Sequence, residues 1–283
     1  MTGRRIVDAH HHVWDLAVRP QPWITGAALA PLARSFGAAE LAAEARAAGV
    51  SGTVVVQTVC VPGETPELLA LAAGSDLVAG VVGWTDLTAP DVGEALAALR
   101  ARPGGDRLAG VRHQVQEEPD PRWLLRPDVL RGLDAVAGAG LVYDLVVTPR
   151  QLPAAVEAAA RIEGLTFVLD HLGKPPVAAG ALEPWAGDLS RLAALPNTVA
   201  KLSGLVTEAA PGARWPGSLA PYARTALDAF GPQRLLFGSD WPVCTLRADY
   251  ATVLGIADAL TAELAPAEKD AVFGGNAVRV YGL

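Results

Sequence analysis

The chain has 283 residues, of which 51% are hydrophobic and 19% are charged, and its formal net charge at pH 7 is −7. This negative charge repels phosphate groups and anionic lipids, which argues against nucleic acid or a membrane surface as a partner. The two cysteines, Cys60 and Cys244, lie far apart and support neither a disulfide framework nor a structural zinc site, so we expect buried thiols.

No hydrophobic signal segment follows the N-terminus, and no later apolar stretch is long enough to span a bilayer. We therefore expect a cytoplasmic protein whose partner is a small-molecule substrate. The sequence indicates no oligomeric state.

Eight short β-branched segments recur along the chain, and each precedes a turn and an Ala- and Leu-rich stretch with helical spacing. Strands that are apolar on nearly every residue are buried on both faces, and their alternation with helices implies a parallel sheet. The predicted strands are 5–12, 52–59, 77–84, 110–116, 141–147, 165–171, 198–203 and 234–240, and the predicted helices are 38–48, 65–73, 90–100, 127–139, 149–162, 187–194, 222–230 and 250–260.

Eight such units predict a single domain, residues 1–283, folded as a (β/α)8 TIM barrel. The alternative is an open doubly wound sheet, which normally has a Gly-rich phosphate-binding turn after its first strand. Here histidines follow the first strand instead. The barrel is therefore the favoured fold.

The first predicted strand ends in three consecutive histidines. Side chains alternate faces along a strand, so His10 and His12 point the same way and His11 points the opposite way. Neutral imidazole is both a metal ligand and a hydrogen-bonding group. The His10 and His12 pair therefore suits a single cation, or a site that polarises water and a carbonyl; a solvated histidine cluster is the third interpretation.

Polar residues also end four later strands, and all five histidines of the chain lie at predicted strand ends. The carboxyl ends of barrel strands meet at one rim, where barrel enzymes keep their chemistry. Two long connections, 14–36 and 204–221, fall on the same face and are either a lid over a small substrate or surface decoration. The polar residues expected at the rim are Arg112, His113, Gln116, Asp170, His171, Lys174, Lys201, Ser203, Ser239 and Asp240.

Five motifs occur in order along the chain. They are Asp-x-His-x-His-x-Trp-Asp at 8–15, Gly-Val-Arg-His at 110–113, Leu-Asp-His-Leu-Gly-Lys-Pro at 169–175, Lys-Leu-Ser-Gly-Leu at 201–205 and Phe-Gly-Ser-Asp-Trp-Pro at 237–242. Together they resemble the amidohydrolase-2 family of the amidohydrolase superfamily. More narrowly, the chain is similar to the sugar-lactone hydrolases of that family, the L-fucono- and L-rhamnono-lactonase-like branch.

The resemblance implies a barrel in which His10, His12, His171 and Asp240 line the reaction centre. The chain departs from the binuclear members, because its fifth strand offers no histidine and its fourth offers no bridging lysine or glutamate. We therefore do not expect two metals. One divalent cation, with zinc the first choice, would be held by His10, His12 and Asp240 with His171 near, and a metal-free site is the alternative.

Opening a lactone needs a nucleophilic water, a polarised carbonyl and a proton for the leaving alkoxide. We expect Asp240 to accept the water proton and return it to the ring oxygen, and His171 to polarise the carbonyl. Asp170 is a candidate to orient His171, and Asp8 to support the rim. The residues expected to contact the substrate are Arg112, Gln116, Lys174 and Lys201, with Trp84 and Trp241 as apolar walls.

Two questions stay open at this point. Arg112 and Gln116 share one strand face and His113 the other, so only one set should face the barrel, and Arg112 and Gln116 are favoured. The favoured function is a hydrolase that opens a small aldonolactone of sugar catabolism. The alternatives are a metal-dependent decarboxylase of an aromatic or unsaturated acid, distinguished by an absolute need for the cation, and a non-enzymatic binding barrel.

Overall fold

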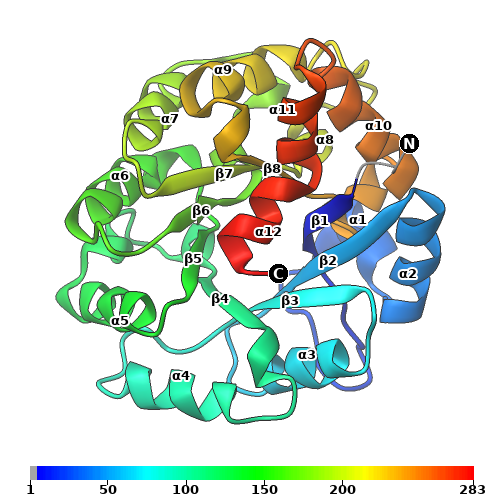
Figure 1. Cartoon of the computed structure of the whole chain (residues 1–283). Coiled ribbons are helices and arrows are strands. Elements are labelled where there is room, and N and C mark those ends of the chain that lie inside the picture. Colours follow the sequence, from blue (N-terminus) through cyan, green and yellow to red (C-terminus); the bar gives the residue numbers. More distant parts are fainter. Residues whose placement is uncertain (1–4) are drawn as a thin grey trace.

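The eight predicted strands all form, and they pair in chain order into one parallel sheet (Figure 1). The computed structural model describes residues 5–283. Beyond the last strand, the backbone N–H of His12 donates to the carbonyl of Trp241 at 2.6 Å and joins the two edges of the sheet. The strands are β1 (Ile6–His11), β2 (Val50–Val56), β3 (Val78–Gly83), β4 (Leu108–His113), β5 (Val142–Leu145), β6 (Phe167–Leu169), β7 (Thr198–Leu202) and β8 (Leu235–Phe237).

The predicted TIM barrel is therefore confirmed, because a doubly wound sheet reverses its strand order and this sheet does not. Helices surround the strands (Figure 1). The eight predicted helices form as α2 (Ala38–Ala47), α3 (Glu64–Ala73), α4 (Val92–Arg100), α5 (Pro127–Gly138), α6 (Leu152–Arg161), α7 (Trp185–Ala193), α9 (Ala220–Phe230) and α10 (Tyr250–Leu260), and short helices add α1 (Gly26–Leu29), α8 (Leu205–Glu208), α11 (Pro266–Asp270) and α12 (Asn276–Tyr281).

Every predicted strand ends earlier than expected, and the differences after β4, β6 and β8 position the site. The segment after β4 curls into a 3-10 turn at Val115–Glu117. After β6, His171 and Leu172 adopt φ of 54° and 52°, the left-handed region that breaks an extended chain. After β8, Asp240 has a φ of 58°. These tight turns lift the polar side chains above the barrel rim.

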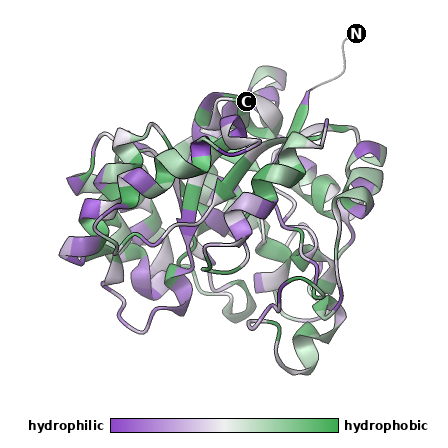
Figure 2. Cartoon of the chain, turned by 90° about the horizontal axis from the view of Figure 1, so that it is seen from below, coloured by the Kyte–Doolittle hydropathy of each residue, from purple (hydrophilic) through white to green (hydrophobic). Residues whose placement is uncertain are grey.

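Hydrophobic side chains fill two layers, one inside the barrel and one between strands and helices. Figure 2 shows the hydrophobic colour on the central strands and more hydrophilic residues on the surrounding helices and loops. The C-terminal helix α12 lies across the barrel opening in Figure 1 and packs Ala277 and Tyr281 against the inner layer. That end of the barrel is closed, which leaves the carboxyl ends of the strands as the accessible face.

None of the helices within residues 5–283 combines the length and the apolar character needed to cross a membrane. The cytoplasmic location stays a prediction.

Candidate active site

A cavity of about 710 Å³ opens at the carboxyl ends of the strands. His12, His171 and Asp240 line its floor, and both long connections contribute walls, through Trp23 and Glu208 among others. The two ends of the first connection are joined to each other, because Trp14 and Phe36 exchange two backbone hydrogen bonds. The cavity therefore holds the predicted reaction centre beneath a mixed polar and apolar roof.

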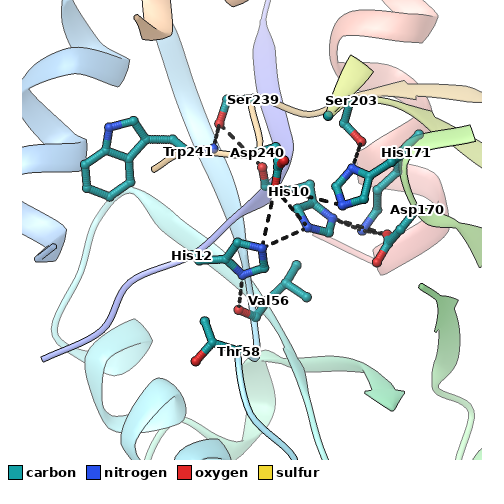
Figure 3. Close-up of polar contacts among 12 residues, drawn as sticks. His10, His12, Val56, Thr58, Asp170, His171, Ser203, Ser239, Asp240 and Trp241 are labelled. Atoms are coloured by element: carbon teal, nitrogen blue, oxygen red, sulfur yellow. Dashed lines mark hydrogen bonds and ion pairs between the residues drawn. The ribbon is translucent and has the colours of Figure 1, made fainter. Parts of the chain in front are cut away.

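Three histidines and one carboxylate converge at this centre (Figure 3). Nε2 of His10 lies 3.2 Å from Nε2 of His12. Asp240 Oδ1 lies 3.8 Å from Nε2 of His10, 3.6 Å from Nε2 of His12 and 3.9 Å from Nε2 of His171. All four side chains are buried. His11 points the other way, to Thr53 Oγ1 at 3.0 Å, so the predicted alternation is confirmed.

The opposite ring nitrogen of each histidine is held by a neighbour, which fixes the ring. His12 Nδ1 donates to the Val56 carbonyl at 2.8 Å. His10 Nδ1 lies 3.0 Å from Lys201 Nζ and 3.2 Å from Asp170 Oδ1, and His171 Nδ1 lies 2.9 Å from Ser203 Oγ. The Val56 carbonyl only accepts, so His12 carries its proton on Nδ1 and directs an Nε2 lone pair into the centre. The Lys201 ammonium only donates, so Nδ1 of His10 accepts from it and the His10 ring proton lies on Nε2, toward His12.

Asp240 stands on a turn that Asp8 holds from below. Asp8 accepts hydrogen bonds from the backbone N–H of Ser239 at 2.8 Å, from Ser239 Oγ at 2.6 Å and from the Tyr250 hydroxyl at 2.8 Å. Asp240 itself donates its backbone N–H to the His10 carbonyl at 2.8 Å. The rim support predicted for Asp8 is confirmed, and these bonds keep Asp240 in a left-handed conformation that only a well-determined turn retains.

The charges at the centre follow from burial and proximity. Burial raises the pKa of Asp240, but the adjacent His171 and His12 outweigh it and hold that pKa below its usual value. Burial lowers the pKa of His171 to about 4 and the pKa of His10 well below its usual value. At neutral pH the centre therefore holds the ionised carboxylate of Asp240 beside the neutral imidazoles of His10 and His171.

A network of buried charges lies beneath His10. Asp170 pairs with Arg112 Nη1 at 2.9 Å and with Lys201 Nζ at 2.9 Å. Lys201 also bonds to Asp144, which accepts from the Tyr281 hydroxyl at 3.0 Å. Asp170, considered above as a partner of His171, therefore contacts His10 instead. A lone acidic residue in the apolar run of β5 was the sequence signal for this network.

The structure separates the predicted substrate contacts into two groups. Arg112, Gln116 and Lys174 line the cavity. Lys201 does not, because its side chain is fully buried between Asp144 and Asp170. The predicted contact is thus replaced by a role in the buried network.

The two predicted tryptophan walls are also absent from the cavity lining among residues 5–283. Trp241 is fully buried, its indole points away from the histidines in Figure 3, and it packs edge-on against Phe36. Trp84 lies behind His113 and donates its indole N–H to it at 3.1 Å. Large aromatic rings at strand ends serve here as packing and hydrogen-bonding groups.

The expectation that only one of Arg112 and His113 faces the site is wrong, because both side chains line the cavity. Strict alternation holds only within a strand, and β4 ends at His113, where the chain turns.

Sequence reasoning missed the lining residues that come from loops, namely Trp23, Thr58, Glu118, Glu208 and Arg247. Cys60 is half-buried and reaches the cavity, whereas Cys244 is buried, as expected.

Gly204 follows β7 and makes close approach to His171 possible. It has a φ of 65°, and a Cβ there would lie 2.5 Å from His171 Nδ1. We expect Gly204→Ala to displace the imidazole, lowering kcat at least tenfold and the free energy of unfolding by about 1 to 3 kcal/mol.

The matched control is Gly212→Ala, which has a similar φ of 78° but open space at Cβ. Kinetics and urea unfolding of both variants check this expectation. Equal turnover in the two variants would contradict the steric role of Gly204.

Comparison with known proteins places the chain in a family. The Amidohydro_2 model, described as Amidohydrolase, matches residues 7–283. An L-fucono-1,5-lactonase of Burkholderia multivorans is 41% identical, with 99% of this chain and 97% of that protein covered. An L-fucono-1,5-lactonase of Burkholderia ambifaria is 39% identical, with 98% and 95% covered.

A crystal structure of an amidohydrolase from Burkholderia multivorans with bound zinc is 41% identical, covers 99% of both chains and has a TM-score of 0.92. Two decarboxylase structures match at 14% and 15% identity, which shows a common fold alone. The family model spans nearly the whole chain, and its motifs stand at the rim described above. The chain therefore belongs to the Amidohydro_2 family of amidohydrolases.

Proposed function

We propose that the chain is a hydrolase that opens a small sugar lactone. The observation that carries the proposal is the similarity, over nearly the whole chain, to two proteins named L-fucono-1,5-lactonase. The buried, ionised carboxylate of Asp240 beside the neutral imidazole of His171 supports it, because a proton acceptor and a carbonyl-polarising group are what ester hydrolysis requires. The decarboxylase alternative has only the fold in its favour.

Asp240 is the proposed proton carrier. A water beside Oδ1 attacks the lactone carbonyl and forms the new C–O bond, while the ionised carboxylate takes up its proton. The tetrahedral intermediate then collapses, the bond from the carbonyl carbon to the ring oxygen breaks, and Asp240 returns the proton to that oxygen. No group on the protein is acylated in this scheme.

His171 is the proposed carbonyl-polarising group. Ser203 Oγ, 2.9 Å away, can donate its hydroxyl proton to Nδ1 of the neutral ring. In that tautomer Nε2 carries the ring proton and donates it to the carbonyl oxygen, whose negative charge grows in the transition state. The contact with Ser203 is thus compatible with the tautomer that this role needs.

We further propose that the site holds one divalent cation. Nε2 of His10 and Nε2 of His12 lie 3.2 Å apart, which suits a shared cation because tetrahedral zinc spaces its nitrogen ligands by roughly 3.3 Å. Binding of the cation would move the His10 ring proton from Nε2 to Nδ1, which lies 3.2 Å from Asp170 Oδ1. Asp240 Oδ1 completes the set of ligands. Zinc bound there would supply a positive charge that stabilises developing negative charge. The metal-free alternative rests on Arg112, whose Nη1 lies 3.4 Å from His10 Nε2.

Metal content distinguishes the two arrangements. We expect about one equivalent of zinc in the purified protein and less than a tenth of that in His12→Asn, measured by elemental analysis. A second group of close donors, His10, Asp170 and His171, shares His10 with the first, so we expect one ion and not two. Two equivalents that are both needed for activity, or full activity after exhaustive chelation, would contradict the proposed site.

The cavity favours an uncharged substrate. Four carboxylates line it, on Glu117, Glu118, Glu208 and Asp240, against the two cationic side chains Lys174 and Arg247, since Arg112 is paired with Asp170. A pH-indicator assay follows the proton that ring opening releases. We expect kcat/KM to be at least a hundredfold higher for L-fucono-1,5-lactone than for 2-pyrone-4,6-dicarboxylate. The reverse preference would contradict a sugar-lactone function.

A further inference from the structure

The cavity wall beside β4 carries a chain of three side chains that the proposed reaction does not use. Trp84 Nε1 donates to His113 Nδ1 at 3.1 Å, and His113 Nε2 lies 2.7 Å from Glu118 Oε1. An indole N–H can only donate, so His113 Nδ1 accepts and the ring proton lies on Nε2. His113 therefore donates to the Glu118 carboxylate.

The imidazole in this chain is held rigidly. The ring of His113 stacks on Trp123, with centroids 4.2 Å apart and planes 10° apart, and Trp123 is itself buried. Burial lowers the pKa of His113 in spite of the opposing effect of Glu118. A neutral ring with both nitrogens engaged cannot exchange protons with a substrate, but it can fix the direction of a carboxylate.

Glu118 is anchored at its backbone and open at its tip. Arg150 donates to the carbonyls of Glu118 and Pro119. Oε1 accepts from His113, whereas Oε2 accepts no hydrogen bond from any residue between 5 and 283. The side chain is 27% exposed and lines the cavity. A fixed carboxylate with a free oxygen is an acceptor for hydroxyl hydrogens.

The position of Glu118 indicates which part of a ligand it meets. β4 lies four strands from β8 in an eight-stranded barrel, so the two strands are on opposite sides of the rim. Asp240 and Glu118 line the same cavity, so a lactone whose ester bond lies at Asp240 and whose ring extends across the cavity meets Glu118 with its hydroxyl groups.

We propose that Glu118 binds the hydroxyl groups of the lactone ring and determines the preference for polyhydroxylated over unsubstituted lactones, with Trp84 and His113 as positioning residues. The inference rests on the proposed lactonase function and names its substrate class. A carboxylated lactone would be rejected at the same place, because two carboxylates would face each other.

The test compares L-fucono-1,5-lactone with δ-valerolactone, the same six-membered ring without hydroxyl groups. We expect Glu118→Ala to raise KM for the sugar lactone about tenfold to a hundredfold, with kcat within threefold of wild type. For δ-valerolactone, kcat/KM should stay within twofold, which also shows that the variant is folded. If the turnover of δ-valerolactone is too slow to follow, the inhibition constant of δ-valerolactone in the sugar-lactone assay replaces kcat/KM.

Two more variants separate positioning from folding. His113→Phe keeps the ring that stacks on Trp123 but removes both hydrogen bonds, so it should reproduce the selective rise in KM and add nothing in a Glu118→Ala background. Glu118→Gln keeps the shape and should show a smaller selective loss.

The outcomes decide separately on the inference and on the function it rests on. If each of the variants Glu118→Gln and Glu118→Ala loses kcat/KM equally on the two lactones, Glu118 has a structural role. That result would overturn the inference and leave the proposed lactonase function intact. A wild-type preference for δ-valerolactone would do the same. A wild-type protein that opens neither lactone would overturn the proposed function and the inference together.

Discussion

Asp240→Asn should lower kcat for the sugar lactone about a thousandfold or more, because it removes the ionised carboxylate proposed to accept the water proton. The fold should survive the change. Asn has nearly the same shape and tolerates the left-handed backbone that Asp240 adopts at φ 58°. Steady-state kinetics and thermal unfolding of the purified variant check both statements.

The matched control is Asp106→Asn, the same chemical change on a side chain that is 82% exposed. Its kcat should equal that of wild type. An Asp240→Asn variant that retains even a tenth of normal turnover would assign the proton transfer to another group.

Lys201→Met should lower the free energy of unfolding by about 3 to 5 kcal/mol. The ammonium group lies 2.9 Å from Asp170 and also bonds to Asp144, and all three side chains are fully buried. Removing the cation leaves Asp144 without a countercharge and Asp170 with Arg112 alone in the barrel interior, where an unpaired charge is costly. Methionine fills a similar volume, so the loss reports charge pairing more than packing.

Arg224→Met provides the comparison for this second change. Arg224 pairs with Glu263 at 3.4 Å, but the two side chains are 66% and 81% exposed. Water screens such pairs, and the variant should lie within about 0.5 kcal/mol of wild type in urea unfolding. Similar losses in the two variants would show that the buried network contributes no more than a surface ion pair.

The barrel could be predicted from the sequence because its signal repeats eight times. Each apolar run is short and each helical stretch follows it, so an error of a few residues at one boundary does not change the architecture. The boundaries themselves were less accurate. The left-handed turns at His171 and Asp240 depend on contacts with Ser203 and Asp8, which are 32 and 232 residues away along the chain.

The cluster of three histidines and Asp240 could also be predicted from the sequence. His10 and His12 follow from the alternation of side chains along a strand, and His171 and Asp240 follow from their positions at strand ends. The network of buried charges beneath His10 could not be predicted in this way. Asp170 contacts His10 across the barrel, and Tyr281 reaches Asp144 from the last helix. No local pattern specifies such pairs. The prediction that Lys201 contacts the lactone was wrong for the same reason. Its burial depends on Asp144 and Asp170, which lie far away in the sequence.

A single turnover of L-fucono-1,5-lactone in ¹⁸O-labelled water, with enzyme in excess, tests the central claim that a sugar lactone is opened here by direct attack of water. Direct attack places one labelled oxygen in the product carboxylate, and mass spectrometry of the digested protein should find none in the peptide that carries Asp240. Label in the Asp240 carboxylate would mean that this side chain attacks the carbonyl and forms an acyl intermediate, which would contradict the account.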